Sequence, residues 1–185
     1  MFLLKIAQLG NPVIRSGSEP LSQEELKTPS LQNLIDAMIQ TMRDADGVGI
    51  AAPQVHVAKR IIVIEISPDN PRYPHRQTVP LTVIINPEIT CQSEEQQEDW
   101  EGCLSVPDLR GKVPRSSSVR VSGLDRYGKP LEIQADHFFA RVIQHEVDHL
   151  NGKVFLDRLP DLKTLTYLKE YQKYWQSDTL DQNWR

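Results

Sequence analysis

The segment DHFFARVIQHEVDHLNG, residues 136–152, constrains the fold more than any other stretch of the chain. Asp136 is a suitable N-cap and Gly152 a suitable residue just after a helix end, so the sequence predicts one helix between them. Its apolar residues lie on two neighbouring stripes: Phe138 and Val142 on one, and Phe139, Ile143 and Leu150 on the next. Because so much of the circumference is apolar, we expect this helix to lie inside the protein rather than on its surface.

The other predicted elements are two helices on either side of a region rich in strands. Residues 31–45 show an amphipathic helical pattern, with Ser30 as N-cap and Gly47 just past the end. An amphipathic helix is also predicted at about 159–177. Runs of β-branched residues predict strands at 60–66, 81–89, 118–125 and 131–135, the last two joined as a hairpin by the turn DRYGKP.

Length and charge limit the kinds of protein that this chain can be. Its 185 residues contain no linker rich in Pro, Gly and Ser, so we expect one domain over residues 1–185. The net charge of −4 argues against a nucleic-acid partner. The N-terminal stretch MFLLKIAQLGNPVIR predicts neither a signal peptide nor a membrane span, so we expect a cytoplasmic protein. The polar run at 92–99 is expected to be a solvated loop or an edge segment.

Within the predicted internal helix, QHEVDHLNG places two histidines four residues apart. At that spacing His145 and His149 project from one face and can bind one metal ion, with Glu146 beside the ion. A metal lowers the pKa of a bound water, and an adjacent carboxylate can take its proton and pass it to a leaving amine. The alternative is a pair of buried, hydrogen-bonded core histidines.

A catalytic metal usually has three protein ligands, so a third must be sought. No histidine follows His149, and the downstream candidates are acidic: Asp157, Asp161, Glu170, Asp178 and Asp181. Upstream, EGCLSVP at 101–107 offers Cys103, whose thiolate would suit zinc or ferrous iron. Taken alone, however, a single cysteine is more often a small buried hydrophobe, and Cys91 has no comparable setting.

The third stretch with chemical potential is GVGIAAPQ at 47–54. Gly47 and Gly49 would let a ligand approach the main chain closely, and the Gln54 amide could face a developing oxyanion. A helix cap at Gly47 followed by an ordinary Ala-Ala-Pro turn explains the same residues equally well. This stretch alone therefore leaves the function open.

Taken together, in this order and spacing, the three stretches resemble the three signature motifs of the peptide deformylases. The resemblance extends from LGNPVIR near the N-terminus to about residue 158, and it covers residues 67–80 and the C-terminal helix poorly. It implies a hydrolase that removes the formyl group from the N-terminal formyl-methionine of newly made proteins. It also implies one divalent metal per chain, Fe²⁺ by expectation, with Zn²⁺, Ni²⁺ or Co²⁺ as substitutes.

The resemblance assigns roles to individual residues. Cys103, His145 and His149 would be the metal ligands, and Glu146 the general base and acid. Gln54 and the backbone N–H of Leu104 would hold the formyl oxygen, and Glu101 and Arg115 would form a supporting ion pair. The implied substrate-binding residues are Val48, Gly49, Arg110, Phe138 and Val142. Arg141 and Asp99 stand where other members carry apolar residues, so the resemblance gives neither a pocket role.

The implied fold is α+β, with small, mostly antiparallel sheets wrapped around a central helix that carries the HExxH motif, and with a C-terminal helix. The implied partners are N-formylmethionyl peptides of nascent chains and the ribosome surface, without a specific nucleic acid and without a membrane. A plastid protein whose transit peptide has been removed is an alternative to the cytoplasm. The competing functions are a metallopeptidase that cuts internal peptide bonds and a metal-stabilised binding domain, for which a fourth protein ligand would be required.

Overall fold

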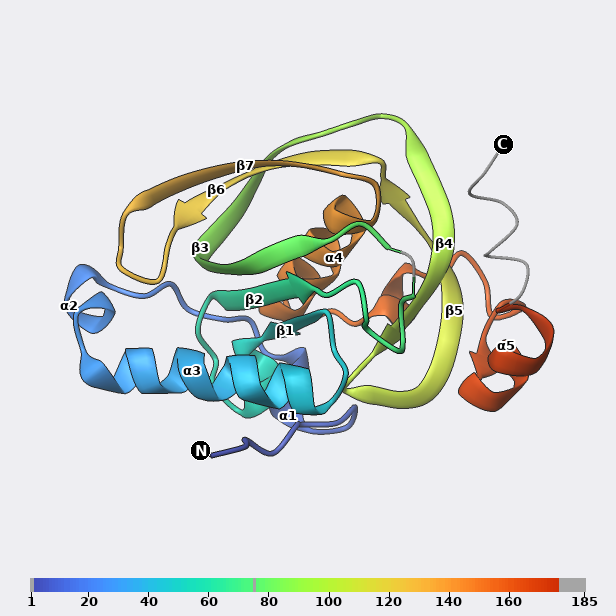
Figure 1. Cartoon of the computed structure of the whole chain (residues 1–185), viewed down its shortest axis with the longest axis horizontal. Helices are drawn as coiled ribbons and strands as arrows, with labels where there is room; N and C mark the ends of the chain where they lie inside the picture. Colours follow the sequence, from blue (N-terminus) through green and yellow to red (C-terminus); the bar gives the residue numbers. More distant parts are fainter. Residues whose placement is uncertain (1, 75, 177–185) are drawn as a thin grey trace.

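Two antiparallel sheets and a buried helix make up the fold, which a computed structural model describes for residues 2–74 and 76–176 (Figure 1). The larger sheet has five strands in the order β1-β2-β3-β6-β7, and the smaller has three in the order β4-β5-β8. The strands are β1 Gly49–Ala51, β2 Ile61–Ile66, β3 Val79–Gln92, β4 Gln96–Cys103, β5 Val106–Ser116, β6 Ser118–Leu124, β7 Pro130–Asp136 and β8 Thr166–Tyr167.

Helices lie inside and around these sheets. They are α1 Pro12–Arg15, α2 Gln23–Leu26, α3 Pro29–Asp44, α4 His137–Leu150 and α5 Leu168–Tyr174, with 3-10 turns at Ala52–Val55 and Phe155–Arg158. Figure 1 shows α4 enclosed by the strands, α3 along one side of the molecule and α5 at one end. The predicted α+β fold around a central HExxH helix is therefore confirmed. No helix in the described part of the chain is long and apolar enough to cross a membrane.

Helix α4 is buried along almost its whole length, as its sequence predicts. All of its residues except His137 and Phe139 are buried. Its apolar side chains pack with the inner face of the larger sheet in one core, which contains Ile64, Ile84, Val121, Ile143 and Leu150. Gly152 follows the helix with a φ of +69°, a left-handed conformation that suits glycine. This packing fixes the HExxH helix relative to both sheets.

Strand β3 bends, and the bend lets the larger sheet curve around α4. Its first half pairs with β2 and its second half with β6, and the pairing is irregular between Ile85 and Glu88. Asn86 lies at the irregularity with a φ of +51°. Its side chain accepts a hydrogen bond from Leu21 N at 2.8 Å and donates one to Leu21 O at 3.0 Å, which anchors the bend to the N-terminal segment.

Helix α3 begins earlier than the sequence pattern suggests. Thr28, not Ser30, is the N-cap: its hydroxyl accepts a hydrogen bond from Leu31 N at 3.3 Å. Pro29 then occupies the first helical position, where a missing N–H does no harm. The helix ends at Asp44, and Gly47 N donates to Met42 O at 2.8 Å, so Gly47 lies just past the end as expected.

The prediction of a continuous helix at 159–177 is wrong. Residues 155–158 form a 3-10 turn, and the Asp161 carboxylate accepts a hydrogen bond from Lys163 N at 2.7 Å, which favours a turn over a helix. The two residues of β8 then pair with β5, and α5 runs only from Leu168 to Tyr174. Residue 177 lies outside the described residues. Aromatic contacts hold α5 to β4: the Trp100 ring is 5.1 Å from that of Tyr171.

All four predicted strands are present, as β2, β3, β6 and β7, and part of one polar stretch forms a further strand. Strand β3 is longer than the predicted 81–89, and β4 begins at Gln96, within the run 92–99. Because β4 pairs with β5 alone, the edge interpretation of that run holds for its second half. Residues 67–74 and 76–78 contain turns and no regular structure, and Asn70 ties this segment to the loop after α3 by donating to Asp46 O at 3.1 Å.

Candidate metal centre and substrate pocket

Three side chains that could bind a metal converge where β4 meets α4. Strand β4 ends at Cys103, and the motif helix presents His145 and His149. The ligand atoms of these residues lie within 4.8 Å of one another, and all three residues are buried. The Cys103 Sγ and the His149 Nε2 are 3.2 Å apart. Within residues 2–74 and 76–176 no other cluster of three such side chains is found.

A buried ion cluster orients His145. Its Nδ1 lies 2.9 Å from the Glu101 Oε2, which leaves Nε2 free to face the metal site. Glu101 in turn accepts two hydrogen bonds from Arg115, at 2.9 and 3.0 Å. The expected pair of Glu101 and Arg115 is therefore present, and it acts on the site through the imidazole ring of His145.

Two further charged residues join this cluster, and the sequence analysis gave them no role in it. Arg141 donates to the Glu101 Oε1 at 2.8 Å and to Val113 O at 2.7 Å. Asp148 accepts from Arg115 at 2.5 Å and from Arg158 at 2.6 Å. Both residues belong to a helix that the sequence predicts to be buried, and a buried charge requires a partner. That requirement was the signal that could have identified them.

The electrostatics of the donor set favour a cation. Burial alone would raise the pKa of the Cys103 thiol, but His149 and His145 outweigh it and hold the pKa well below its usual range. Burial alone would likewise lower the pKa of His145, but its hydrogen bonds to Cys103 and Glu101 raise it. The protein therefore stabilises a thiolate beside two imidazoles. One thiolate and two imidazoles form a donor set that suits zinc or ferrous iron, so these residues fit a divalent metal.

Glu146 lies beside this donor set without a partner of its own. Its Oε2 is buried and has no hydrogen-bond partner among the described residues. Burial raises the pKa of Glu146 to about 7. Gly49 makes room for the side chain, because a Cβ at that position would lie 2.3 Å from the Glu146 Oε1. The first and third sequence motifs therefore meet at this carboxylate.

Gln54 is held with its amide toward the metal centre. It is buried, and its Oε1 accepts a hydrogen bond from Ala51 N at 2.8 Å. The amide nitrogen Nε2 consequently faces Ser105 Oγ at 3.2 Å and Cys103 Sγ at 3.6 Å. Leu104, which follows Cys103, lines the same pocket. The structure thus brings Gln54, Cys103 and Leu104 together.

An apolar pocket opens beside the metal centre. It is lined by Val48, Gly49, Phe138 and Val142, together with Cys103, His145 and Glu146. Four of the five predicted substrate-binding residues therefore lie in one pocket, and the fifth, Arg110, lies in an adjoining hollow. Arg141 also lines the pocket, whereas Asp99 forms an ion pair with Arg76 at 2.7 Å.

The fold and this centre define a class: an α+β protein in which three buried side chains could bind a metal ion beside a carboxylate and an apolar pocket, as in metal-dependent hydrolases. Comparison with known proteins specifies the family. Residues 3–165 match the sequence model of the polypeptide deformylase family. The peptide deformylase of Leptospira biflexa is 43% identical over 167 residues, covering 90% of this chain and 93% of that protein. Peptide deformylase 2 of a Nostoc species is 45% identical over 172 residues, covering 92% and 94%.

Solved structures agree with the sequence relatives. A class I type b peptide deformylase from Acinetobacter baumannii with Met-Ala-Ser bound has a TM-score of 0.83 and 44% identity, covering 85% of this chain and 99% of that one. A peptide deformylase from Synechococcus elongatus in complex with actinonin has a TM-score of 0.76 and 39% identity, covering 85% and 79%. The chain belongs to the peptide deformylase family. Its reaction is the hydrolytic removal of the formyl group from N-terminal formyl-methionine, which releases formate.

Proposed function

We propose that deformylation takes place at the centre formed by Cys103, His145 and His149, which hold one divalent cation. The observation that carries the proposal is the convergence of these three buried ligand atoms beside the partnerless carboxylate of Glu146. We propose Fe²⁺ as the ion in the cell, with Zn²⁺, Ni²⁺ or Co²⁺ able to replace it, because a mixed thiolate and imidazole set binds all of these ions.

The residues around the ion divide the chemical work. When bound, the cation supplies Lewis acidity, which lowers the pKa of water and polarises the formyl oxygen. Glu146 accepts a proton from the attacking water and delivers it to the leaving amine, and it is free to do so because it forms no ion pair among the described residues. His145 keeps its orientation through Glu101.

Gln54 and Leu104 stabilise charge on the formyl oxygen. The Gln54 amide is oriented by its hydrogen bond from Ala51 N, so no side-chain rearrangement is required when negative charge develops. The backbone N–H of Leu104 supplies a second donor from the adjacent β4–β5 turn. Preorganised donors of this kind typically contribute about 10²–10³ in kcat.

The apolar pocket takes the methionine side chain of the substrate. Val48, Phe138 and Val142 provide apolar walls, and an unbranched, polarisable side chain adapts well to such walls. The related deformylase from Acinetobacter baumannii has been solved with the peptide Met-Ala-Ser bound, which supports a peptide substrate here. We place the enzyme in the cytoplasm at the ribosome surface, where formylated N-termini emerge, or in a plastid if a transit peptide has been removed.

The direct test is formate release from formyl-Met-Ala-Ser by protein purified without oxygen, with metal per chain measured on the same sample. We expect turnover that depends on bound metal. A metal-loaded protein that releases no formate would contradict the proposal, and cleavage of casein instead would favour the metallopeptidase alternative. For the ligand assignment, Cys103→Ser should lose metal, because a neutral hydroxyl is a poor ligand. The matched Cys91→Ser, at an exposed position on β3, should retain it.

A further inference from the structure

A second hollow adjoins the methionine pocket, and the chain builds it partly from segments outside the family match. It has a volume of about 200 Å³. Residues 71–73 form one wall, Trp100 and Arg110 of the β4–β5 hairpin another, and α5 a third. Arg72, Tyr73 and Trp100 also line the methionine pocket, so the two spaces share a wall. Helix α5 lies beyond residues 3–165, the part that the family model matches.

Arg110 brings a buried positive charge to this hollow. The residue is 6% exposed. Its Nη1 donates to its neighbour Leu109 O at 2.8 Å, and within residues 2–74 and 76–176 it forms no ion pair with a carboxylate. A buried guanidinium normally has an anionic partner, because burial of an unpaired charge is costly. Because no carboxylate of the described residues pairs with Arg110, an anionic ligand is the partner that the hollow leaves room for.

A second guanidinium reinforces the charge of the hollow. Arg72 is half-buried, and its guanidinium lies 5.8 Å from the centre of the Tyr73 ring, without a carboxylate partner in the described part of the chain. Burial lowers the pKa of Arg110, and the like charge of Arg72 lowers it further, against the opposing effect of Tyr73. Among the residues that line the hollow, Asp46 carries the one carboxylate, and it pairs with neither arginine. The lining therefore has a net positive charge.

The position of Arg110 connects the hollow with the methionine pocket. Gly102 lines the methionine pocket, and a Cβ on Gly102 would lie 2.1 Å from the Arg110 Nη1. The guanidinium thus lies against the backbone at the pocket edge. Arg110 therefore lies between the methionine pocket, which Gly102 lines, and the hollow, which Arg110 itself lines.

We propose that this hollow binds a carboxylate of the substrate downstream of the methionine, through Arg72 and Arg110. The carboxylate can come from an acidic side chain at the third position or from the free C-terminus of a short peptide. This inference rests on the proposed function, because it assumes that the methionine side chain fills the apolar pocket. It makes the 71–73 turn and α5 determinants of substrate selection.

The two carboxylate sources can be separated with three peptides of equal length. Formyl-Met-Ala-Gln-amide is the neutral reference, formyl-Met-Ala-Glu-amide adds a side-chain carboxylate, and formyl-Met-Ala-Gln with a free C-terminus adds a terminal one. We expect kcat/KM to rise roughly five- to tenfold for at least one carboxylate, as for a charge-assisted pair that stays partly solvated. The advantage should shrink when salt is raised, because partly exposed charges are screened.

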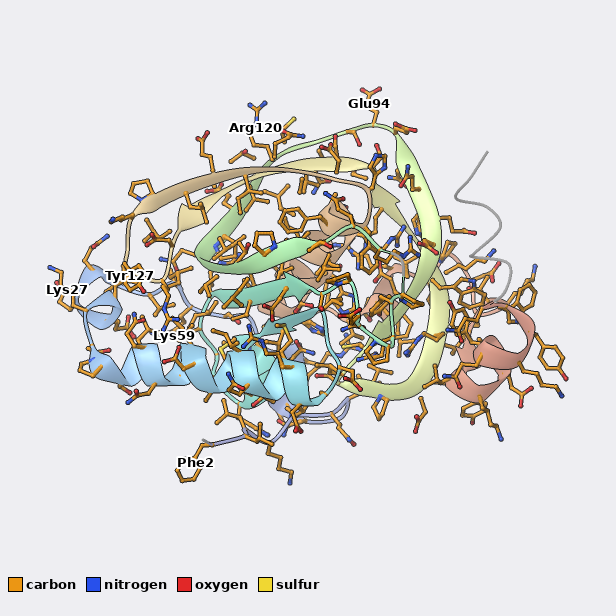
Figure 2. All side chains as sticks on the ribbon, in the orientation of Figure 1. Phe2, Lys27, Lys59, Glu94, Arg120 and Tyr127 are labelled. Carbon is orange, nitrogen blue, oxygen red and sulfur yellow. The ribbon has the colours of Figure 1, made fainter. Side chains whose placement is uncertain are left out.

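Variants then assign the effect to the hollow. Arg72→Gln should bring the ratio of acidic to neutral kcat/KM toward one. The matched control is Arg120→Gln, since Arg120 is exposed on β6 and projects from the outer rim of the molecule (Figure 2), and this variant should keep the wild-type ratio. Equal rates for all three peptides in the wild type, or a ratio unaffected by Arg72→Gln, would overturn the inference. If the neutral peptide itself releases no formate, the proposed function fails instead.

Discussion

The Glu146 carboxylate is buried and unpaired, because the residues around it leave space for it without offering a hydrogen-bond partner. Gly49 has no Cβ to occupy the space beside the Glu146 Oε1, and Oε2 has no hydrogen-bond partner among the described residues. Glu101 on β4 shows the opposite condition, because Arg115 and Arg141 both donate hydrogen bonds to its carboxylate. The first carboxylate is free to move a proton, and the second is fixed as a support for His145.

Replacement of Glu146 by alanine should separate metal binding from catalysis. The three ligand atoms belong to Cys103, His145 and His149, so Glu146→Ala should keep its metal. Its formate release should fall by about 10²–10⁴, the usual contribution of a general acid or base. Metal per chain and kcat, measured on one preparation, test the retained metal binding and the lost activity together. Loss of the metal, or turnover near that of the wild type, would show that the role is misassigned.

Gly49→Ala should impair catalysis through the position of Glu146. The added Cβ would lie 2.3 Å from the Glu146 Oε1, closer than two such atoms approach, so the carboxylate must shift. We expect kcat to fall about 10²-fold while metal content is retained, because misplacement by about 1 Å can cost that much. Gly17→Ala is the matched control, since a Cβ there meets nothing within 4 Å. Equal kcat values for the two variants would contradict this reading.

At the scale of elements, the sequence predicted the helices and strands whose formation depends on residues close together in the chain. The buried α4, strands β2 and β3 and the β6–β7 hairpin follow from apolar periodicity and turn residues. The C-terminal part does not, because β8 exists only through its pairing with β5 and α5 is held by the aromatic contact to Trp100. Both partners are more than fifty residues away in the sequence, beyond the reach of a periodicity argument.

The same limit applies to the metal centre. The three ligands and Glu146 stand in two recognisable motifs, EGCLSVP and QHEVDHLNG, so the sequence was sufficient to nominate them. The partners of Arg141 and Asp148 were not predictable in this way, because they come from β4, β5 and the turn at Phe155–Arg158. A sequence can show that a buried charge needs a partner, but the tertiary fold decides which residue supplies it.

Arg141 should therefore matter for stability, because it ties α4 to both strands of the β4–β5 hairpin. It donates to Val113 O at 2.7 Å, to Gln97 O at 2.5 Å and to the Glu101 carboxylate. In Arg141→Leu these acceptors lose a buried charged donor, and we expect the free energy of unfolding to fall by about 3–5 kcal/mol. Denaturant titration measures the change. The exposed Arg120→Leu should change it by less than about 0.5 kcal/mol, and similar losses in both variants would contradict the argument.

At the scale of the whole molecule, the metal site takes its ligands from two parts of the fold that the buried ion pairs of Arg141 and Asp148 also connect. Cys103 ends a strand of the three-stranded sheet, whereas His145 and His149 belong to a helix whose apolar residues pack against the five-stranded sheet. Cys103 itself packs in a different core from the one that surrounds α4. A bound cation would therefore cross-link two cores, and its removal should weaken the whole fold rather than the site alone.

Metal removal should consequently lower the thermal stability of the protein. A ligand that binds only the folded state stabilises it by about 4 kcal/mol at a concentration a thousandfold above its Kd. For a chain of this size each kcal/mol corresponds to about 2–4 °C in Tm, so we expect a fall of roughly 8–16 °C on chelation, reversed by added Ni²⁺ or Zn²⁺. Glu146→Ala should show the same metal-dependent shift although it is inactive, because its ligands are intact. Cys103→Ser should show little or none, because it lacks the ligand that the three-stranded sheet supplies. A full metal-dependent shift in Cys103→Ser would mean that the two histidines hold the ion without β4, and the cross-link between the cores would then be absent.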